Sequence, residues 1–166
     1  MDQFSYSESV VVDASAQALY DLVTDISRTG EWSPICQKCW WRDGDGPRPG
    51  AWFHGRNEAD GRTWETESQV AVAEPGQEFA WLVGGKYARW SYRFEPGPDG
   101  TVLTETWTFL PEGRELFRTK YGAEAEYMIA LRRRQARDGI PATLAAIKRI
   151  AEAPSPSSRR PRRPAS

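Results

Sequence analysis

One carboxylate stands in an apolar row of the chain. Glu105 shares a strand face with Leu103 and Trp107, because residues two apart in a strand point to the same side. A carboxyl group on an apolar face loses contact with water, which raises its pKa and suits it to act as a general acid or base, or as a polar anchor for a ligand. The alternative is that Glu105 lies near the end of the sheet and pairs with an arginine or a tyrosine.

Two further polar side chains fall on faces that strand alternation predicts to be inward. Tyr92 follows Trp90 at a spacing of two, and Asn57 shares a face with Phe53. The phenol and the amide can both orient a ligand by hydrogen bonding. Asn57 can equally satisfy backbone groups at a bend that Gly55 permits.

One histidine and two cysteines complete the residues with chemical potential. His54 is a candidate proton carrier together with Glu105 and Tyr92, although no Ser, Cys or Asp is spaced to complete a triad with it. Cys36 and Cys39 form a C-x-x-C pair without the second pair that structural zinc requires, so we expect no metal. We interpret the two cysteines as partly buried thiols, with a redox role as the alternative.

Aromatic side chains are unusually numerous, with eight Trp, six Tyr and six Phe. Tryptophan supplies a large rigid apolar surface, so such a chain either packs a wide core or lines a cavity. Trp32 would be a lid at the mouth of that cavity or a plug that closes the core. Phe117 and Tyr121, one turn apart on the C-terminal helix, would face the sheet as core, with the tyrosine hydroxyl the part able to reach a ligand. The residues expected to contact a ligand are Trp32, Trp41, Phe53, Asn57, Trp64, Trp81, Trp90, Trp107, Phe117 and Tyr121.

Composition restricts the class of protein. The chain has 166 residues, 39% of them apolar and 27% charged, which fits one globular domain. A mean hydropathy of −0.67 and the lack of a long apolar run argue against membrane insertion. No secretory signal is visible at the start and there are only two cysteines, so we expect a reducing cytoplasm. Net charge is −1, and because four arginines lie within 159–163 the remainder is acidic, which argues against nucleic acid binding.

The elements that must position these side chains are strands followed by a long helix. Residues 112–151 carry apolar positions at helical intervals, with a kink or restart expected at Pro141, and residues 132–134, three successive arginines, are interpreted as a polar face of that helix. Ser15 is expected to cap a short helix, and residues 25–32 to form a second short helical piece. Strands are predicted over 4–12, 38–42, 51–58, 63–73, 78–83, 87–95 and 101–110.

Short loops between these strands predict an antiparallel meander. The expected fold class is therefore α+β, with a seven-stranded curved antiparallel sheet wrapped around the C-terminal helix and two short helices between strands 1 and 2. A curved sheet cannot meet one helix everywhere, so the gap between them becomes a pocket. We expect this domain to span 1–151, followed by a disordered tail rich in Pro, Ser and Arg over 152–166.

Several short motifs are spread over residues 3–151. They are DISRTGEWSP at 25–34, GAWFHGRN at 50–57, RTWET at 62–66, EPG at 74–76, WSYRFEP at 90–96 and GT at 100–101 with TETW at 104–107. With them the chain resembles the SRPBCC superfamily, START-like and polyketide cyclase/dehydratase-like, and within it a group of small stand-alone actinobacterial proteins. The resemblance implies a helix-grip fold, but the superfamily hosts lipid transfer, hormone sensing, cyclisation and co-chaperone roles on one scaffold.

Three functions therefore stay open. The first is binding of a hydrophobic small molecule, lipid-like or aromatic and polyketide-like, oriented by Asn57, Tyr92 and Glu105. The second is a polyketide cyclase/aromatase-dehydratase-type enzyme in which Glu105, Tyr92 and His54 carry protons. The third is a co-chaperone-like interaction module, which predicts an exposed apolar patch and a pocket too small for a ligand. We expect no cofactor and no nucleic acid partner, and a monomer or homodimer.

Overall fold

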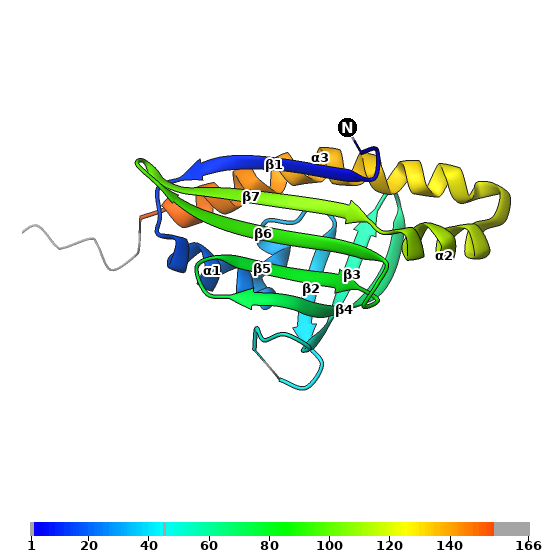
Figure 1. The fold of residues 1–166 in the computed structure, drawn as a ribbon, viewed down its shortest axis with the longest axis horizontal. Helices are drawn as coiled ribbons and strands as arrows, with labels where there is room; N and C mark the ends of the chain where they lie inside the picture. The colour runs from blue at the N-terminus through cyan, green and yellow to red at the C-terminus, as the bar shows by residue number, and fades with distance from the viewer. Residues whose placement is uncertain (1, 45, 155–166) are drawn as a thin grey trace, which may run out of the picture.

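The computed structural model describes residues 2–44 and 46–154. In this part of the chain seven strands form one antiparallel sheet in the order β1-β7-β6-β5-β4-β3-β2 (Figure 1). The elements in chain order are β1 (Ser5–Val12), α1 (Ala16–Thr24), the 3-10 helix η1 (Ile26–Glu31), β2 (Cys36–Trp41), β3 (Trp52–Ala59), β4 (Arg62–Glu74), β5 (Glu78–Val83), β6 (Ala88–Gly97), β7 (Gly100–Phe109), α2 (Pro111–Tyr121), the 3-10 helix η2 (Gly122–Glu124) and α3 (Ala125–Glu152).

The sheet curves around α3, which packs along β1 and β7. Figure 1 shows α1 at one end of the sheet and α2 at the other. The predicted α+β architecture, with a seven-stranded antiparallel sheet, a long C-terminal helix and two short helices between strands 1 and 2, is therefore confirmed. The predicted cap is also present, because the backbone N–H of Ala18 donates to the Ser15 hydroxyl at 3.1 Å.

The C-terminal helical region is divided differently from the prediction. Helix α3 continues unbroken through Pro141, and the division falls at Gly122, between α2 and α3. Gly122 has φ of 53°, a positive value that glycine adopts without steric cost. The chain reverses direction between α2 and α3 (Figure 1). Ile140 and Leu144 beside the proline are 1% and 3% exposed. Their burial outweighs the cost of about 3 kcal/mol that a proline inside a helix carries.

The inner face of the sheet is filled at one end. Val12, Leu19 and Leu103 are fully buried there, and they belong to the same core cluster as Leu144 and Ile147 from the C-terminal half of α3. Nearer the N-terminal half of α3 the inward residues of the sheet are larger and line a cavity instead. The same helix therefore closes a packed core with one half and a hollow with the other.

Two sequence-based expectations concern the ends of the chain and the membrane. Within the described residues, no helix combines the length and the apolar character that crossing a bilayer requires. The expected tail begins at the end of α3, and its residues 155–166 lie outside the described residues.

Candidate functional site

A cavity of about 550 Å³ lies between the inner face of the sheet and the helices. Small-molecule sites in proteins span about 300–1,000 Å³, so this volume suits a drug-sized guest. On β4 the intervening residues Glu65 and Glu67 also border the cavity. Otherwise strands β3 to β7 contribute alternate residues to its wall, as the period of two requires. These residues are Phe53, Gly55 and Asn57 of β3, Trp64, Thr66 and Ser68 of β4, Phe79, Trp81 and Val83 of β5, Ala88, Trp90 and Tyr92 of β6, and Trp107 and Phe109 of β7.

Trp81 is the centre of the aromatic wall. Its ring stacks on Trp90 with centroids 6.4 Å apart and an angle of 11° between planes. Phe79, Tyr92 and Phe53 have centroids 5.4, 5.8 and 6.1 Å from it. Because each ring is held by its neighbours, the wall presents a broad apolar surface of fixed shape.

Helix α2 covers the opposite side of the cavity. Phe117 lies edge-on to Phe109, with centroids 5.0 Å apart, and Tyr121 lies 5.1 Å from Phe117 in the same manner. Phe117 and Tyr121 line the cavity together with Leu116. The predicted position of this pair, facing the sheet from a helix, is thus the observed one.

Arg132 of α3 is a cavity residue that the sequence analysis missed. Its guanidinium carbon lies 4.3 Å from the centre of the Trp64 ring and 5.8 Å from that of Phe117, and its Nη1 donates to Oε1 of Gln135 at 3.1 Å. Burial lowers the pKa of this guanidinium. Among the described residues it forms no ion pair, so it presents a positive charge to the cavity without a carboxylate to neutralise it.

A signal for Arg132 was present in the sequence. It lies one helical turn from both Met128 and Ala136, which are 3% and 2% exposed. That spacing puts Arg132 on the buried stripe of α3, so the interpretation of residues 132–134 as a polar part of the helix is wrong for Arg132.

Glu105 is buried in the middle of β7, next to the cavity wall. It is 4% exposed and lies directly opposite Tyr92 on β6, which does line the cavity. Loss of water raises its pKa well above the ordinary value, and only a hydrogen bond with Tyr92 opposes this. Its Oε2 has no hydrogen-bond partner among the described residues. The alternative given from the sequence was a Glu105 near the end of the sheet that pairs with an arginine or a tyrosine. A tyrosine does lie beside it, but Glu105 is in the middle of β7.

Tyr92 connects this carboxyl group to the cavity. It is 4% exposed, and burial followed by the nearby Glu105 raises the pKa of its phenol well above the ordinary value. The Trp32 side chain hydrogen-bonds it and acts in the opposite direction. Burial thus favours the protonated form of both groups, and Tyr92 is the one that lines the cavity.

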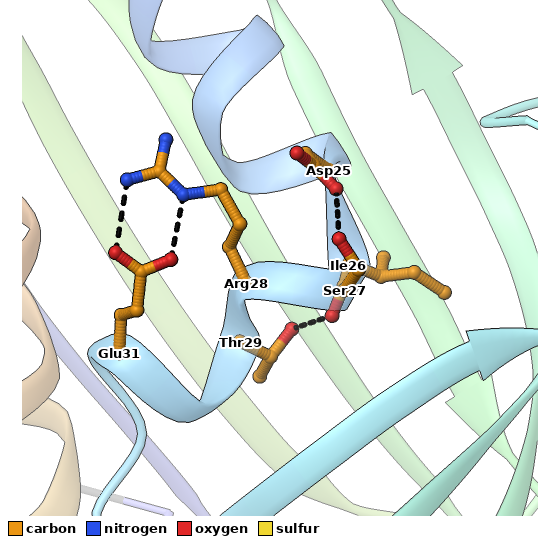
Figure 2. A network of polar contacts seen from close by, with 6 residues as sticks. All are labelled: Asp25, Ile26, Ser27, Arg28, Thr29 and Glu31. Carbon is orange, nitrogen blue, oxygen red and sulfur yellow. Dashed lines mark hydrogen bonds and ion pairs between the residues drawn. The ribbon is translucent and has the colours of Figure 1, made fainter.

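The segment around η1 brings Trp32 and Thr29 to the cavity wall. Figure 2 shows what fixes this segment: Arg28 holds Glu31 through two contacts of 2.6 and 2.9 Å, Ser27 donates to Asp25, and the Thr29 hydroxyl donates to the Ile26 carbonyl at 2.7 Å. Trp32 follows at the end of η1 and is 4% exposed. Its ring forms the cavity wall on this side, a position that fits both predicted roles, a lid over a ligand and a plug that closes the core.

Asn57 serves the backbone of the sheet and also lines the cavity. Its Nδ2 donates to the Trp64 carbonyl at 3.4 Å and to the Thr66 hydroxyl at 3.3 Å. Both interpretations given to it from the sequence thus describe part of its environment. Its carbonyl oxygen makes no hydrogen bond within the described residues.

Two predicted site residues lie outside the cavity wall. His54 follows Phe53 on β3 and so points to the opposite face of the sheet, where it stacks on Trp40 at 5.4 Å and lies 3.6 Å from Glu67. Trp41 pairs with Phe53 across β2 and β3, with ring centres 5.6 Å apart, but it is not among the residues that line the cavity. Their positions do not support the predictions that His54 carries protons for a ligand or that Trp41 contacts one.

The two cysteines were considered as possible metal ligands in the sequence analysis. Cys36 and Cys39 line the cavity as neighbouring free thiols. Within the described residues, no group of three or more His, Cys, Asp and Glu side chains is arranged to hold a metal ion.

A curved antiparallel sheet that grips a long C-terminal helix over an aromatic cavity defines the helix-grip class. The chain belongs to the polyketide cyclase / dehydrase and lipid transport family, whose model matches residues 3–144. No curated protein matches the sequence significantly.

Among solved structures, the chain is similar to the Polyketide_cyc-like protein Cgl2372 from Corynebacterium glutamicum, with 48% identity over 90% of this chain and 91% of that one, and a TM-score of 0.67. It also resembles the di-domain ARO/CYC BexL from the BE-7585A biosynthetic pathway (24% identity, 92% of this chain, TM-score 0.68) and the di-domain ARO/CYC StfQ from the steffimycin pathway (17%, 90%, 0.65). This chain spans about half the length of each, 51% and 50%. These two likenesses concern the fold alone.

Proposed function

We propose that this protein binds a hydrophobic small molecule, aromatic or lipid-like, in the cavity between the sheet and α3. The observation that carries the proposal is the hollow of about 550 Å³ with its wall of aromatic rings. A guest that buries about 250 Å² of apolar surface would gain roughly 6 kcal/mol before the entropic cost of binding. The interaction-module hypothesis requires a pocket too small for a ligand, so this volume disfavours it.

The polar groups of the wall indicate what else the ligand carries. Arg132 offers an unpaired positive charge, and Asn57 lies on the same wall. A charge-assisted hydrogen bond to a buried arginine is worth more than a neutral one. We therefore infer an amphipathic ligand, with an apolar body against Trp81 and an anionic or carbonyl oxygen toward Arg132.

The test is a titration of the full chain with 8-anilinonaphthalene-1-sulfonate, which is aromatic and anionic. Binding should raise the fluorescence of the dye and saturate at one molecule per chain, and native mass spectrometry should detect the same complex. N-phenyl-1-naphthylamine, which lacks the sulfonate, should also bind, since the apolar wall supplies most of the gain. Failure of both dyes to bind the folded protein would refute the proposal.

A second function, a cyclase or dehydratase, is favoured by one observation. A buried carboxyl group whose pKa is raised by burial, that of Glu105, lies beside the cavity-lining phenol of Tyr92. Such a pair can deliver and accept a proton at a carbonyl oxygen, while the cavity folds a polycarbonyl chain so that an aldol step and loss of water follow.

Heptane-2,4,6-trione is a suitable probe for this activity, because intramolecular aldol closure and loss of one water convert it to an aromatic diol. If the pair is catalytic, the protein accelerates this conversion, and Tyr92→Phe and Glu105→Gln each lower the rate by about 100-fold. Dye binding by both variants should be unchanged, which separates loss of proton transfer from loss of the cavity. Equal rates in the variants and the original protein would exclude the role.

A further inference from the structure

The two cysteines face the cavity only because β2 is irregular. Residues three apart in a regular strand point to opposite faces. In β2, Cys36 pairs with Asn57 but Lys38 pairs with Arg56, so Gln37 is an extra residue that forms a β-bulge. The bulge turns Cys36 and Cys39 to the same side, with their sulfur atoms 3.1 Å apart.

Gly55 leaves these sulfur atoms accessible from the cavity. It lies directly opposite Cys39 on β3 and is itself part of the wall. A Cβ atom at this position would lie 3.7 Å from both sulfur atoms and 3.1 Å from the Thr66 hydroxyl. Any larger side chain would therefore cover the pair, whereas glycine leaves it open to a guest.

The contact between the thiols also makes them chemically unequal. A hydrogen bond from Cys36 lowers the pKa of Cys39, with a smaller contribution from Thr29, although burial acts in the opposite direction. The same contact and burial raise the pKa of Cys36. Cys39 is thus the better nucleophile of the two, and Cys36 holds a proton beside it.

We propose that Cys36 and Cys39 form a dithiol redox site in the cavity wall that reduces apolar hydroperoxides. The proposal rests on the cavity admitting apolar guests, as the proposed function requires. Cys39 thiolate attacks the terminal oxygen of the hydroperoxide, the O–O bond breaks, and the alkoxide takes a proton from solvent and leaves as an alcohol. The Cys36 sulfur then attacks the resulting sulfenic acid and expels hydroxide, which takes up the Cys36 proton and leaves as water. The two sulfur atoms lose two electrons in total and form a disulfide, while the peroxide gains them.

The aromatic surroundings of the thiols favour an apolar oxidant over a polar one. Tyr92 lies close enough to Cys36 and Cys39 for both to act electrostatically on its phenol, and the centre of its ring is 5.8 Å from that of Trp81. An alkyl hydroperoxide that carries an aromatic ring can pack on these rings, whereas hydrogen peroxide gains nothing from them. In a reducing compartment the pair would return to the dithiol by exchange with small thiols.

The experiment uses the reduced full chain, whose only two cysteines make the measurement unambiguous. Cumene hydroperoxide should remove both free thiols, lower the intact mass by about 2 Da and leave a monomer on a non-reducing gel, and dithiothreitol should reverse all three changes. Hydrogen peroxide at the same concentration should react about tenfold more slowly, because it lacks the apolar contacts.

Single variants assign the two roles. Cys36→Ser should stop at the sulfenic acid, about 16 Da heavier, and Cys39→Ser should react about tenfold more slowly than the original protein, because the remaining thiol is the less acidic one. Retention of both thiols in the original protein, or oxidation only to linked dimers, would overturn the proposal without reference to any variant. If the protein binds the dyes but its thiols resist cumene hydroperoxide, the redox site is refuted and the binding function stands.

Discussion

In the proposed binding function, Arg132 is the residue of the wall that selects for a polar or anionic group on the ligand. Its charge is partly buried between Trp64 and Phe117 and is satisfied within the described residues only by Gln135. Partial burial of a cation costs free energy unless a group of opposite charge or a hydrogen-bond acceptor contacts it. An anionic group on the ligand would supply that partner.

Replacing Arg132 should therefore affect anionic ligands selectively. Arg132→Met should weaken binding of 8-anilinonaphthalene-1-sulfonate about tenfold, since a hydrogen bond between charged groups contributes about 1.5–3 kcal/mol, and leave N-phenyl-1-naphthylamine nearly unaffected. Arg134→Met, the same change at an exposed position two residues along α3, is the matched control and should alter neither. Equal weakening of both dyes by Arg132→Met would show that the cavity has collapsed instead.

Glu105 should make the stability of the protein depend on pH. Burial raises its pKa in the folded state, so the folded chain binds more protons than the unfolded chain above the ordinary pKa of a carboxyl group. The free energy of unfolding therefore falls as pH rises from about 5 toward the raised pKa. Glu105→Gln, which cannot ionise, should lose this part of the slope and gain stability relative to the original protein as pH increases. Urea unfolding at pH 5, 6, 7 and 8 measures the difference, and parallel curves would contradict the burial of an ionisable carboxyl group.

At the scale of elements, α3 divides the inner face between core and cavity. Ile140, Leu144 and Ile147 are at most 3% exposed in the core, while Arg132 and Ala136 on the preceding turns border the hollow. The small side chain of Ala136 is thus one reason that space remains beneath the helix. Filling it from the helix should remove the site without disturbing the rest of the core.

Ala136→Phe should occupy the cavity and weaken binding of both dyes by about tenfold or more, at a cost in stability of no more than about 1–3 kcal/mol, because the added ring enters empty space. Ala130→Phe places the same ring on the exposed face of α3 and should leave binding unchanged. Thermal unfolding without dye measures the change in stability, and the rise in unfolding temperature on adding dye measures binding. Unchanged dye binding by Ala136→Phe would place the dye somewhere other than the cavity.

The elements also show which features local sequence can predict. Strand alternation is set by backbone geometry, so it correctly turned residues such as Trp64, Trp90 and Trp107 toward one side. The bulge at Gln37 interrupts that alternation, and the spacing of the two cysteines does not predict it. The break at Gly122 was missed because Pro141 is the stronger helix breaker, and only the packing of α3 on the sheet shows that it is tolerated there.

At the scale of the whole molecule, the fold and the inward direction of the strand residues followed from sequence, and the place of Arg132 in the cavity wall did not. Whether a position two residues along a strand faces inward is a local property, but whether Arg132 meets the cavity depends on how α3 crosses a sheet formed by distant residues. The cavity exists because the curved sheet and the path of α3 do not fit closely against each other along their whole length. The type of a single residue does not show where such a gap will form.

The eight tryptophans allow the most direct measurement of the central claim, that the aromatic wall encloses a ligand site. In a two-dimensional ¹H–¹⁵N spectrum of the labelled chain, each indole N–H gives its own signal. Titration with 8-anilinonaphthalene-1-sulfonate should shift the signals of the cavity residues Trp32, Trp64, Trp81, Trp90 and Trp107, and leave those of Trp40 and Trp52, which lie outside the wall, in place. Shifts confined to Trp40 and Trp52, or no shift at any indole, would contradict the claim.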